Sequence, residues 1–206
     1  MQSRPTVVVL AAGKGSRFKG SAHKLEQSLG DLSVLGRTLH NAIESHLPVV
    51  VVTTQALAAA AARIVAARDV VVVPPALAAL GLGHSISAGI AARADAPGWL
   101  LLPGDMPMVR PATLLAVAAA LEHHPVAYAQ YQGRRGHPVG FAAELYSELM
   151  MLSGDEGARR IVARYPAIGV DVEDPGVLLD LDTEADLAAM RVLHAATEQR
   201  PAAGKG

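Results

Sequence analysis

The sequence predicts an α/β fold in which a mostly parallel central sheet is covered by helices on both faces. Short β-branched runs alternate with Ala- and Leu-rich stretches, the βαβ order of a parallel sheet with right-handed crossovers. Hydrophobic residues make up 51% of the chain and aromatic residues only 3%, so we expect an aliphatic core. Val49–Val52 and Val70–Val73 show no polar alternation, which predicts central strands buried on both faces.

The first half of the chain is expected to contain four strands joined by helices. The strands are predicted at Thr6–Ala11, Pro48–Thr53, Asp69–Val73 and Trp99–Leu102. The helices are predicted at residues 33–46, 55–67, 84–94 and 111–122. These helical stretches are rich in alanine and leucine, which lose little conformational freedom in a helix.

The second half is less regular. Val126–Tyr131 and Pro138–Phe141 are predicted to form strands or a hairpin, and a further strand is predicted at Ile168–Val172. Helices are predicted near residues 142–150 and 155–164, and a final helix from about Thr183. A chain of 206 residues suits one domain, which we place at 1–197. Residues 198–206 are rich in Pro, Gly and Ala, so we expect a disordered tail.

Composition excludes several classes of function. The formal net charge of −1 and the low aromatic content argue against a nucleic-acid partner, which needs a broad cationic or stacking surface. The chain has no cysteine, which removes disulfides, thiolate zinc sites and a cysteine nucleophile. No uninterrupted apolar segment approaches the length of a membrane span. We therefore expect a cytoplasmic protein with no membrane partner.

A glycine-rich turn directly after the first strand is the most informative segment for function. It reads Gly13-Lys14-Gly15-Ser16-Arg17, with Lys24 a short distance beyond. Glycines permit close backbone approach to an anion, and the cations supply charge-assisted hydrogen bonds. The spacing fits neither a P-loop nor a dinucleotide-binding turn. The pattern favours a site for a nucleoside triphosphate over the alternative, an ordinary flexible loop between strand and helix.

Acidic residues at two distant positions are candidates for a metal site. Asp105 follows a buried strand whose carboxyl end should lie at the same sheet edge as the Gly13 loop. Asp180 and Asp182 alternate near the last helix, and either could join Asp105 in holding Mg²⁺ together with phosphate oxygens. The alternatives are that Asp105 caps a turn and that Asp182 belongs to a solvated helix start, which Thr183 and Asp186 would cap.

Three further segments could bind substrate. Gly81–Gly89 enters a helix whose first amides suit a base edge or a phosphate; the alternative is a flexible turn capped by His84 or Ser85. Gly136–Phe141 and Ser153–Arg160 carry glycines, a histidine and cations, which would suit the wall of an acceptor site.

With these segments in order, nearly the whole chain resembles the MobA-like nucleotidyltransferases, and most closely the molybdenum cofactor cytidylyltransferases. The resemblance rests on four segments: the glycine-rich loop after the first strand, then Gly81–Gly89, then Gly104-Asp105-Met106-Pro107, and then Asp180–Leu187. The GHPVGF and GDEGAR segments distinguish this family from other nucleotidyltransferases. The resemblance implies a three-layer Rossmann-like nucleotidyltransferase fold, with a nucleotide-binding half at about 1–110 and an acceptor-binding half at about 111–197. It also implies Mg²⁺-dependent transfer of CMP from CTP to the molybdopterin phosphate, with a molybdoenzyme or a cofactor chaperone as a further partner.

The same resemblance implies roles for individual residues. Arg17, Lys24 and Asp105 are expected to be catalytic, with Lys19 as a rival for Lys24. Nucleotide binding is assigned to Leu10, Ala11, Ala12, Gly13, Gly15, Ser16, Arg17, Lys24, Gly83, Ser85 and Asp105. The metal is assigned to Asp105, Asp180 and Asp182, and the acceptor to His137, Pro138, Gly140, Asp155 and Arg159.

Ala12 favours CTP, because the guanylyl members of the family carry glycine at that position. The alternatives are a relative that uses GTP or a sugar or alditol phosphate acceptor, and a non-catalytic nucleotide- or cofactor-binding chaperone.

Overall fold

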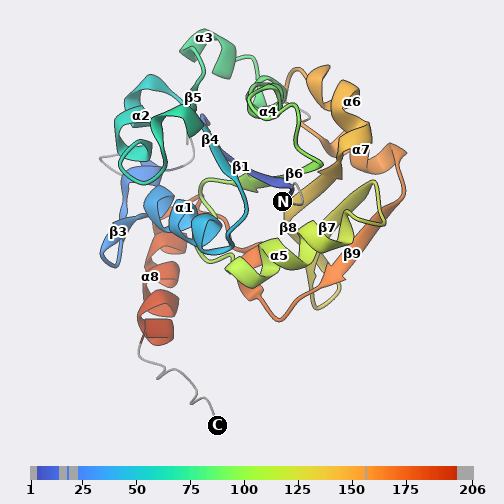
Figure 1. Cartoon of the computed structure of the whole chain (residues 1–206). Helices are drawn as coiled ribbons and strands as arrows, with labels where there is room; N and C mark the ends of the chain where they lie inside the picture. Colours follow the sequence, from blue (N-terminus) through green and yellow to red (C-terminus); the bar gives the residue numbers. More distant parts are fainter. Residues whose placement is uncertain (1–3, 14–17, 19–22, 156, 199–206) are drawn as a thin grey trace.

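Seven strands form one central sheet in the residues that the computed structural model describes, 4–13, 18, 23–155 and 157–198 (Figure 1). In spatial order they are β5 (Val70–Val72), β4 (Val49–Thr53), β1 (Thr6–Ala11), β6 (Gly98–Pro103), β8 (Arg134–Ala142), β7 (Val126–Tyr131) and β9 (Ala167–Asp171). Only β8 runs antiparallel to its neighbours within this described sheet. It reverses because Gln132 and Gly133 both have positive φ angles, as a tight hairpin turn requires. The predicted mostly parallel sheet is confirmed.

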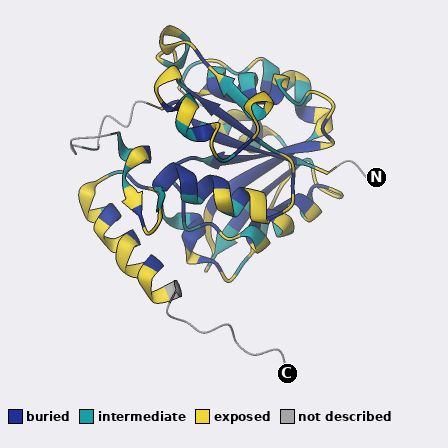
Figure 2. Ribbon diagram, turned by 60° about the vertical axis from the view of Figure 1, so that its left-hand side comes forward, coloured by how far each residue is buried: buried dark blue, intermediate teal, exposed yellow. Residues whose placement is uncertain are grey.

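Helices cover both faces of this sheet (Figure 1). One core cluster receives buried side chains from α1 (Val34–Glu44), α2 (Gln55–Ala61), α5 (Pro111–Ala120) and α8 (Glu184–Glu198). The opposite cluster is built with α4 (Leu82–Ala91), α6 (Tyr146–Met150) and α7 (Arg159–Arg164), beside the short α3 (Pro75–Ala78). Figure 2 shows the buried strands between these two helical layers, while much of α8 is exposed.

Strand β1 shows how the sequence divides the core between the two faces. Val7 and Val9 belong to the cluster beneath α1 and α5, whereas Val8 belongs to the cluster beneath α4. All three are fully buried. Successive side chains of a strand point to opposite faces, so an unbroken apolar run is what a central strand needs.

The prediction of two central valine strands is right for one run and wrong for the other. Val50, Val51 and Val52 of β4 are fully buried. β5 instead lies at the edge of the sheet, and Val72 is 42% exposed. Valine runs report β-propensity as well as burial, so composition alone did not distinguish an edge strand from a central one.

Several short elements were not predicted. They are the hairpin of β2 (Ser28–Leu29) and β3 (Leu32–Ser33), the short helix α3, and the 3₁₀ turns η1 (Lys24–Glu26), η2 (Ala67–Asp69) and η4 (Pro175–Leu178). A further 3₁₀ turn, η3 (Ala143–Leu145), lies within the helix predicted near residues 142–150. Elements of two to four residues carry too few positions for a periodic pattern. Of the tail predicted at 198–206, Glu198 belongs to the last helix of the chain, and residues 199–206 lie outside the described residues. No described helix has the length and apolar character needed to cross a membrane.

The carboxyl ends of β1 and β6 lie side by side and position the site. Leu10 of β1 is paired with Pro103 of β6, and the Gly104 N–H donates to the Leu10 carbonyl at 2.8 Å. Asp105 therefore follows β6 at the edge where the Gly13 loop leaves β1.

Candidate active site

A cavity of about 860 Å³ opens at this edge of the sheet. Leu10–Gly13 from the end of β1 form one part of its wall, and Leu101, Pro103 and Asp105 from β6 form another. Residues of η1, α4, β8 and α7, the segment before α7, and Asp182 complete it. The cavity thus lies at the carboxyl ends of parallel strands, the usual position of a ligand site in an open α/β sheet.

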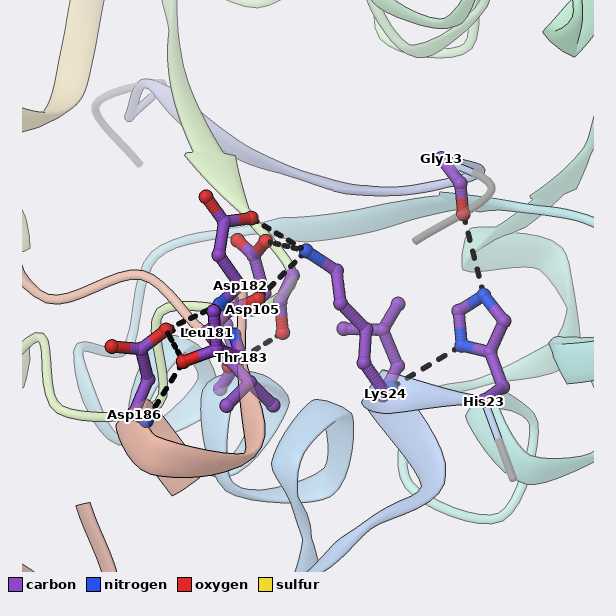
Figure 3. Close-up of polar contacts among 11 residues, drawn as sticks. Gly13, His23, Lys24, Asp105, Leu181, Asp182, Thr183 and Asp186 are labelled. Carbon is purple, nitrogen blue, oxygen red and sulfur yellow. Dashed lines mark hydrogen bonds and ion pairs between the residues drawn. The ribbon is translucent and has the colours of Figure 1, made fainter. Parts of the chain in front are cut away.

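Three oxygen atoms from two distant segments surround the ammonium group of Lys24 (Figure 3). Lys24 Nζ lies 2.6 Å from Asp105 Oδ2 and 3.5 Å from Asp182 Oδ1. It also donates to the main-chain carbonyl of Leu181 at 2.8 Å. The Lys24 and Asp105 side chains are only 12% and 17% exposed. The structure therefore brings together three of the predicted site residues. Lys24 was predicted to bind the nucleotide, whereas here it pairs with the two carboxylates.

His23 fixes the backbone beside Lys24. The Leu25 N–H donates to His23 Nδ1 at 3.2 Å, so Nδ1 is the acceptor nitrogen of the ring. The proton of a neutral imidazole then lies on Nε2, which is 3.3 Å from the Gly13 carbonyl and can donate to it. His23 thus joins the loop after β1 to the turn that carries Lys24. His23 was not among the predicted site residues, and its position next to Lys24 was the only signal that could have indicated it.

A backbone hydrogen bond and a helix cap hold the main chain of Asp105 and Asp182 in place. The Leu181 N–H donates to the Asp105 carbonyl at 3.0 Å, which ties the segment before α8 to the end of β6. Asp186 Oδ2 accepts from the Thr183 N–H at 2.7 Å and from the Asp182 N–H at 3.2 Å. The Asp186 N–H in turn donates to Thr183 Oγ1 at 3.2 Å. The predicted cap by Thr183 and Asp186 is confirmed, and it also orients Asp182.

The Thr183 hydroxyl also donates to Asp186 Oδ2, and this contact lowers the pKa of the Asp186 carboxyl below its ordinary value of 3.8. A hydrogen bond to the ionised form favours that form. The cap therefore holds Asp186 as a carboxylate at neutral pH, which is the form that accepts from the Asp182 and Thr183 amides.

The donor set around Lys24 suits a hard divalent cation. Two carboxylates and a carbonyl provide oxygen ligands of the kind that Mg²⁺ and Mn²⁺ prefer, and phosphate oxygens commonly complete such a site. Asp180 is exposed, whereas Asp182 lines the cavity. Among the described residues, no group of three or more His, Asp or Glu side chains is arranged to hold a metal. Water and phosphate oxygens commonly complete the coordination of a cation held by one or two carboxylates.

The opposite wall of the cavity carries a histidine and two arginines. Arg135, His137, Asp155 and Arg159 line it. Burial lowers the pKa of His137 below its ordinary value of 6.5, outweighing the Leu101 carbonyl and the Asp105 carboxylate, which raise it. His137 Nδ1 is buried without a hydrogen-bond partner. His137 is therefore a neutral imidazole near pH 7.

Pro138 and Gly140, which were predicted to contact the acceptor, alternate in β8 with His137 and Val139. His137 and Val139 line the cavity. A Cβ atom at Gly140 would lie 3.1–3.3 Å from Leu121 and Val117, so this position faces α5. Within β8, the structure brings His137 to the cavity and places Gly140 against the core.

The start of α4 is packed against protein backbone. The Gly83 N–H donates to the Gly154 carbonyl at 2.9 Å, and a Cβ atom at Gly83 would come within 2.6–2.8 Å of the Ser153 backbone. Gly83 is thus required for close approach of the two loops, and its amide is already used. Ser85, two residues further along α4, lines the cavity.

The remaining predicted nucleotide contacts divide into two groups. Leu10, Ala11, Ala12 and Gly13 line the cavity. Gly15, Ser16 and Arg17, together with the rival Lys19, lie outside the described residues. The prediction missed several cavity residues on strands and helices, among them Leu25, Leu82, Ile86, Leu101, Pro103, Arg135, Gly136, Val139 and Val162. Alternation along β8 would have indicated Val139 once His137 was chosen.

Comparison with known proteins places this geometry in context. A family model described as the MobA-like NTP transferase domain matches residues 7–168. The chain is 34% identical over 113 residues to the bifunctional protein GlmU of Corynebacterium aurimucosum, covering 52% of this chain and 23% of that protein. It spans about a quarter of the length of that protein and of a GlmU from Alkalilimnicola ehrlichii.

Solved structures match over nearly the whole chain. Rv0371c from Mycobacterium tuberculosis H37Rv is similar with a TM-score of 0.77 and 30% identity, covering 92% of this chain and 99% of that one. The manganese complex of the same protein is similar with a TM-score of 0.75. A Methanothermobacter nucleotidyl transferase, Mth528, has a TM-score of 0.77 and 25% identity, covering 94% of this chain and 99% of that one.

Proposed function

The chain belongs to the MobA-like NTP transferase domain family, and we propose that it transfers CMP from CTP to the terminal phosphate of molybdopterin in the molybdenum cofactor, releasing pyrophosphate. The observation that carries this proposal is the convergence of Lys24, Asp105 and Asp182 on the wall of a cavity that also contains the end of β1. Cationic and acidic groups placed together in this way suit a triphosphate that carries a divalent cation.

The chain's own groups would act mainly by positioning charge. In the proposed step an oxygen of the acceptor phosphate attacks the α-phosphorus of CTP, and the bond to pyrophosphate breaks. A phosphomonoester is largely ionised at neutral pH because its second pKa is about 6, so the step needs no general base. Lys24 and the loop after Gly13 are proposed to hold the triphosphate, which aligns the attacking and leaving oxygens.

Asp105 and Asp182 are proposed to hold a divalent cation in the reacting complex. Such an ion would neutralise negative charge on the phosphate oxygens. The manganese complex of Rv0371c supports a divalent cation in this family. We propose Mg²⁺ as the ion used by this chain, since nucleoside triphosphates commonly carry it.

The acceptor is proposed to bind along Arg135, His137, Asp155 and Arg159. The two arginines offer charge-assisted hydrogen bonds to a phosphate. Arg135 also lies over the ring of Tyr128, with its guanidinium carbon 4.7 Å from the ring centroid, which steadies the side chain. A neutral His137 can hydrogen-bond the acceptor without adding a charge to a buried position.

CTP is proposed over GTP because of Ala12. Ala12 lines the cavity and is only 4% exposed, so its methyl group occupies space that a glycine would leave open. A smaller space suits a pyrimidine better than a purine.

The proposal is tested by measuring pyrophosphate release with CTP, GTP, UTP or ATP. Each nucleotide is offered with molybdenum cofactor, a sugar phosphate or an alditol phosphate. We expect release with CTP and molybdenum cofactor. Release with GTP or with another acceptor would replace this proposal by a different transferase activity, and nucleotide binding without release in any combination would indicate a binding protein.

The variant Asp105→Ala tests the role of the carboxylate in the same assay. We expect turnover to fall by about a hundredfold or more, the scale for loss of one electrostatic stabiliser of a transition state. The fold should persist, since Lys24 keeps Asp182 and the Leu181 carbonyl as partners. Asp95→Ala, at an exposed aspartate outside the cavity wall, is the control. Near-normal turnover of Asp105→Ala would contradict the assignment.

A further inference from the structure

We propose that the Lys24 ammonium and the divalent cation compete for the same oxygen atoms, so that cation binding moves Lys24 out of this position and toward the triphosphate. This inference rests on the proposed function for the identity of the two ligands. It concerns how the site exchanges one cation for another, and it makes Lys24 the group that couples metal binding to nucleotide binding.

The contacts of Lys24 are those of a cation in a coordination site. Its three N–H donors face Asp105 Oδ2 at 2.6 Å, the Leu181 carbonyl at 2.8 Å and Asp182 Oδ1 at 3.5 Å. All three acceptors are hard oxygens, which Mg²⁺ and Mn²⁺ also bind, at metal–oxygen distances of about 2.1 Å. An ion that close to the two carboxylates would lie within the space that the ammonium occupies. The two cations therefore exclude one another by volume and by repulsion.

The main chain of the residues that supply these oxygen atoms is tied by hydrogen bonds. Asp105 and the Leu181 carbonyl are tied by the hydrogen bond from Leu181 N to Asp105 O, and Asp182 is oriented by the α8 cap. The backbone of Lys24 is held by His23 and by its buried neighbour Leu25. The four-carbon stem of Lys24 has several rotatable bonds, and it borders the cavity. Exchange thus requires rotation of one side chain.

A triphosphate would favour this exchange of cations in two ways. Its oxygens offer the displaced ammonium a new anionic partner, and they supply the ligands that the described residues lack for a complete metal site. Metal and nucleotide should then bind cooperatively, and by linkage each should raise the affinity for the other by the same factor. Without nucleotide, Lys24 offsets one of the two carboxylate charges and occupies the space beside their oxygens, so the metal binds weakly.

The test measures binding of Mn²⁺ alone, by the electron paramagnetic resonance signal of the free ion, with no nucleotide or acceptor present. We expect Lys24→Met to bind Mn²⁺ about tenfold or more tightly than the wild type, a typical size for such coupling. Lys24→Gln, which keeps a hydrogen-bond donor, should behave in the same direction and serves if the methionine variant fails to fold. Arg93→Met is the matched control, because Arg93 also pairs with a carboxylate, that of Asp69, outside the cavity wall.

A non-hydrolysable CTP analogue then tests the coupling. It should tighten Mn²⁺ binding in the wild type and in Arg93→Met by a larger factor than in Lys24→Met. Adding Asp105→Asn to Lys24→Met should abolish the gain in affinity. Equal Mn²⁺ affinity of the wild type and both Lys24 variants would overturn the proposal. The measurement involves no turnover, so a protein that released no pyrophosphate would still give a result here.

Discussion

At the scale of single residues, His23 fixes the backbone position of its neighbour Lys24, although His23 has no proposed role in the reaction. His23 accepts from the Leu25 amide and contacts the Gly13 carbonyl. These contacts set the tautomer of the ring and connect the loop after β1 with the turn η1. The lysine therefore reaches Asp105, which lies 81 positions away in the sequence, from a backbone that is already placed.

His137 should make the stability of the protein depend on pH. Its pKa in the folded protein lies below 6.5 because burial disfavours the charged ring. As the pH falls below about 6.5, the unfolded chain takes up a proton first, so the free energy of unfolding decreases until the folded pKa is passed. In His137→Asn this contribution is absent. Between about pH 6.5 and 5.5, the wild type should therefore lose up to about 1.4 kcal/mol more per pH unit than the variant.

Urea denaturation at several pH values measures this difference. His123→Asn is the control, since His123 is an exposed histidine at the end of α5, and its profile should follow the wild type. Parallel profiles for the wild type and His137→Asn would contradict the prediction.

At the scale of elements, the first turn of α8 both caps a helix and orients a site residue. Thr183 and Asp186 satisfy each other's backbone amides, and Asp186 also accepts from the amide of Asp182. Leu187, Met190 and His194 then form the buried stripe of the helix, with the three- and four-residue spacing of one helix face. The helix is thus anchored along its length, and its beginning lies where Asp182 is needed.

Thr183→Ala should weaken this cap. Loss of the hydroxyl is expected to lower the free energy of unfolding by about 1 kcal/mol. It should also raise the pKa of the Asp186 carboxyl toward 3.8, since the Thr183 hydroxyl is the largest cause of its lowering. Chemical denaturation and a carbon-13 titration of Asp186 give the two values. Thr183→Ser keeps the hydroxyl and should preserve both; an unchanged Asp186 pKa in Thr183→Ala would show that the hydrogen bond has no such effect.

At the scale of the whole molecule, α4 packs directly on β1 and β4 at Gly89. A Cβ atom at Gly89 would collide with the Val8 side chain and lie 2.8 Å from Val52 Cγ2. Both valines are fully buried, and their β-branched side chains have little rotamer freedom. Gly89 therefore sets the distance between this helix and the strands that lead to the cavity.

Gly89→Ala should destabilise the protein in spite of the better helix propensity of alanine. Overpacking of this kind costs about 1–3 kcal/mol, while the propensity gain is about 1 kcal/mol, so we expect a net loss of roughly 1 kcal/mol. Ala91→Leu adds volume at an exposed position of the same helix and should leave stability nearly unchanged. Urea midpoints compare the two, and a Gly89→Ala variant as stable as the wild type would mean that the layers can separate freely.

The order of strands and helices could be predicted because it depends on local patterns. Runs such as Val7–Val9 and Val50–Val52 allow few structures other than strands, and Asp105 was a candidate from its place after a run of this kind. The edge position of β5 could not be predicted, because it depends on which strands pair and not on the valines themselves. The partners of Lys24 could not be predicted either, because they come from segments 81 and 157 positions away in the sequence.

The sequence by itself determined the α/β class, the cap of α8 and the residue types available for a phosphate and metal site. These features follow from periodicity, backbone preference and side-chain chemistry, which act over a few residues. Only the tertiary structure decided that the Lys24 ammonium lies among the oxygens of Asp105, Leu181 and Asp182, and that Gly140 faces the core. Such contacts arise when sheet pairing and helix packing bring distant segments within hydrogen-bond distance, and no local pattern encodes that distance.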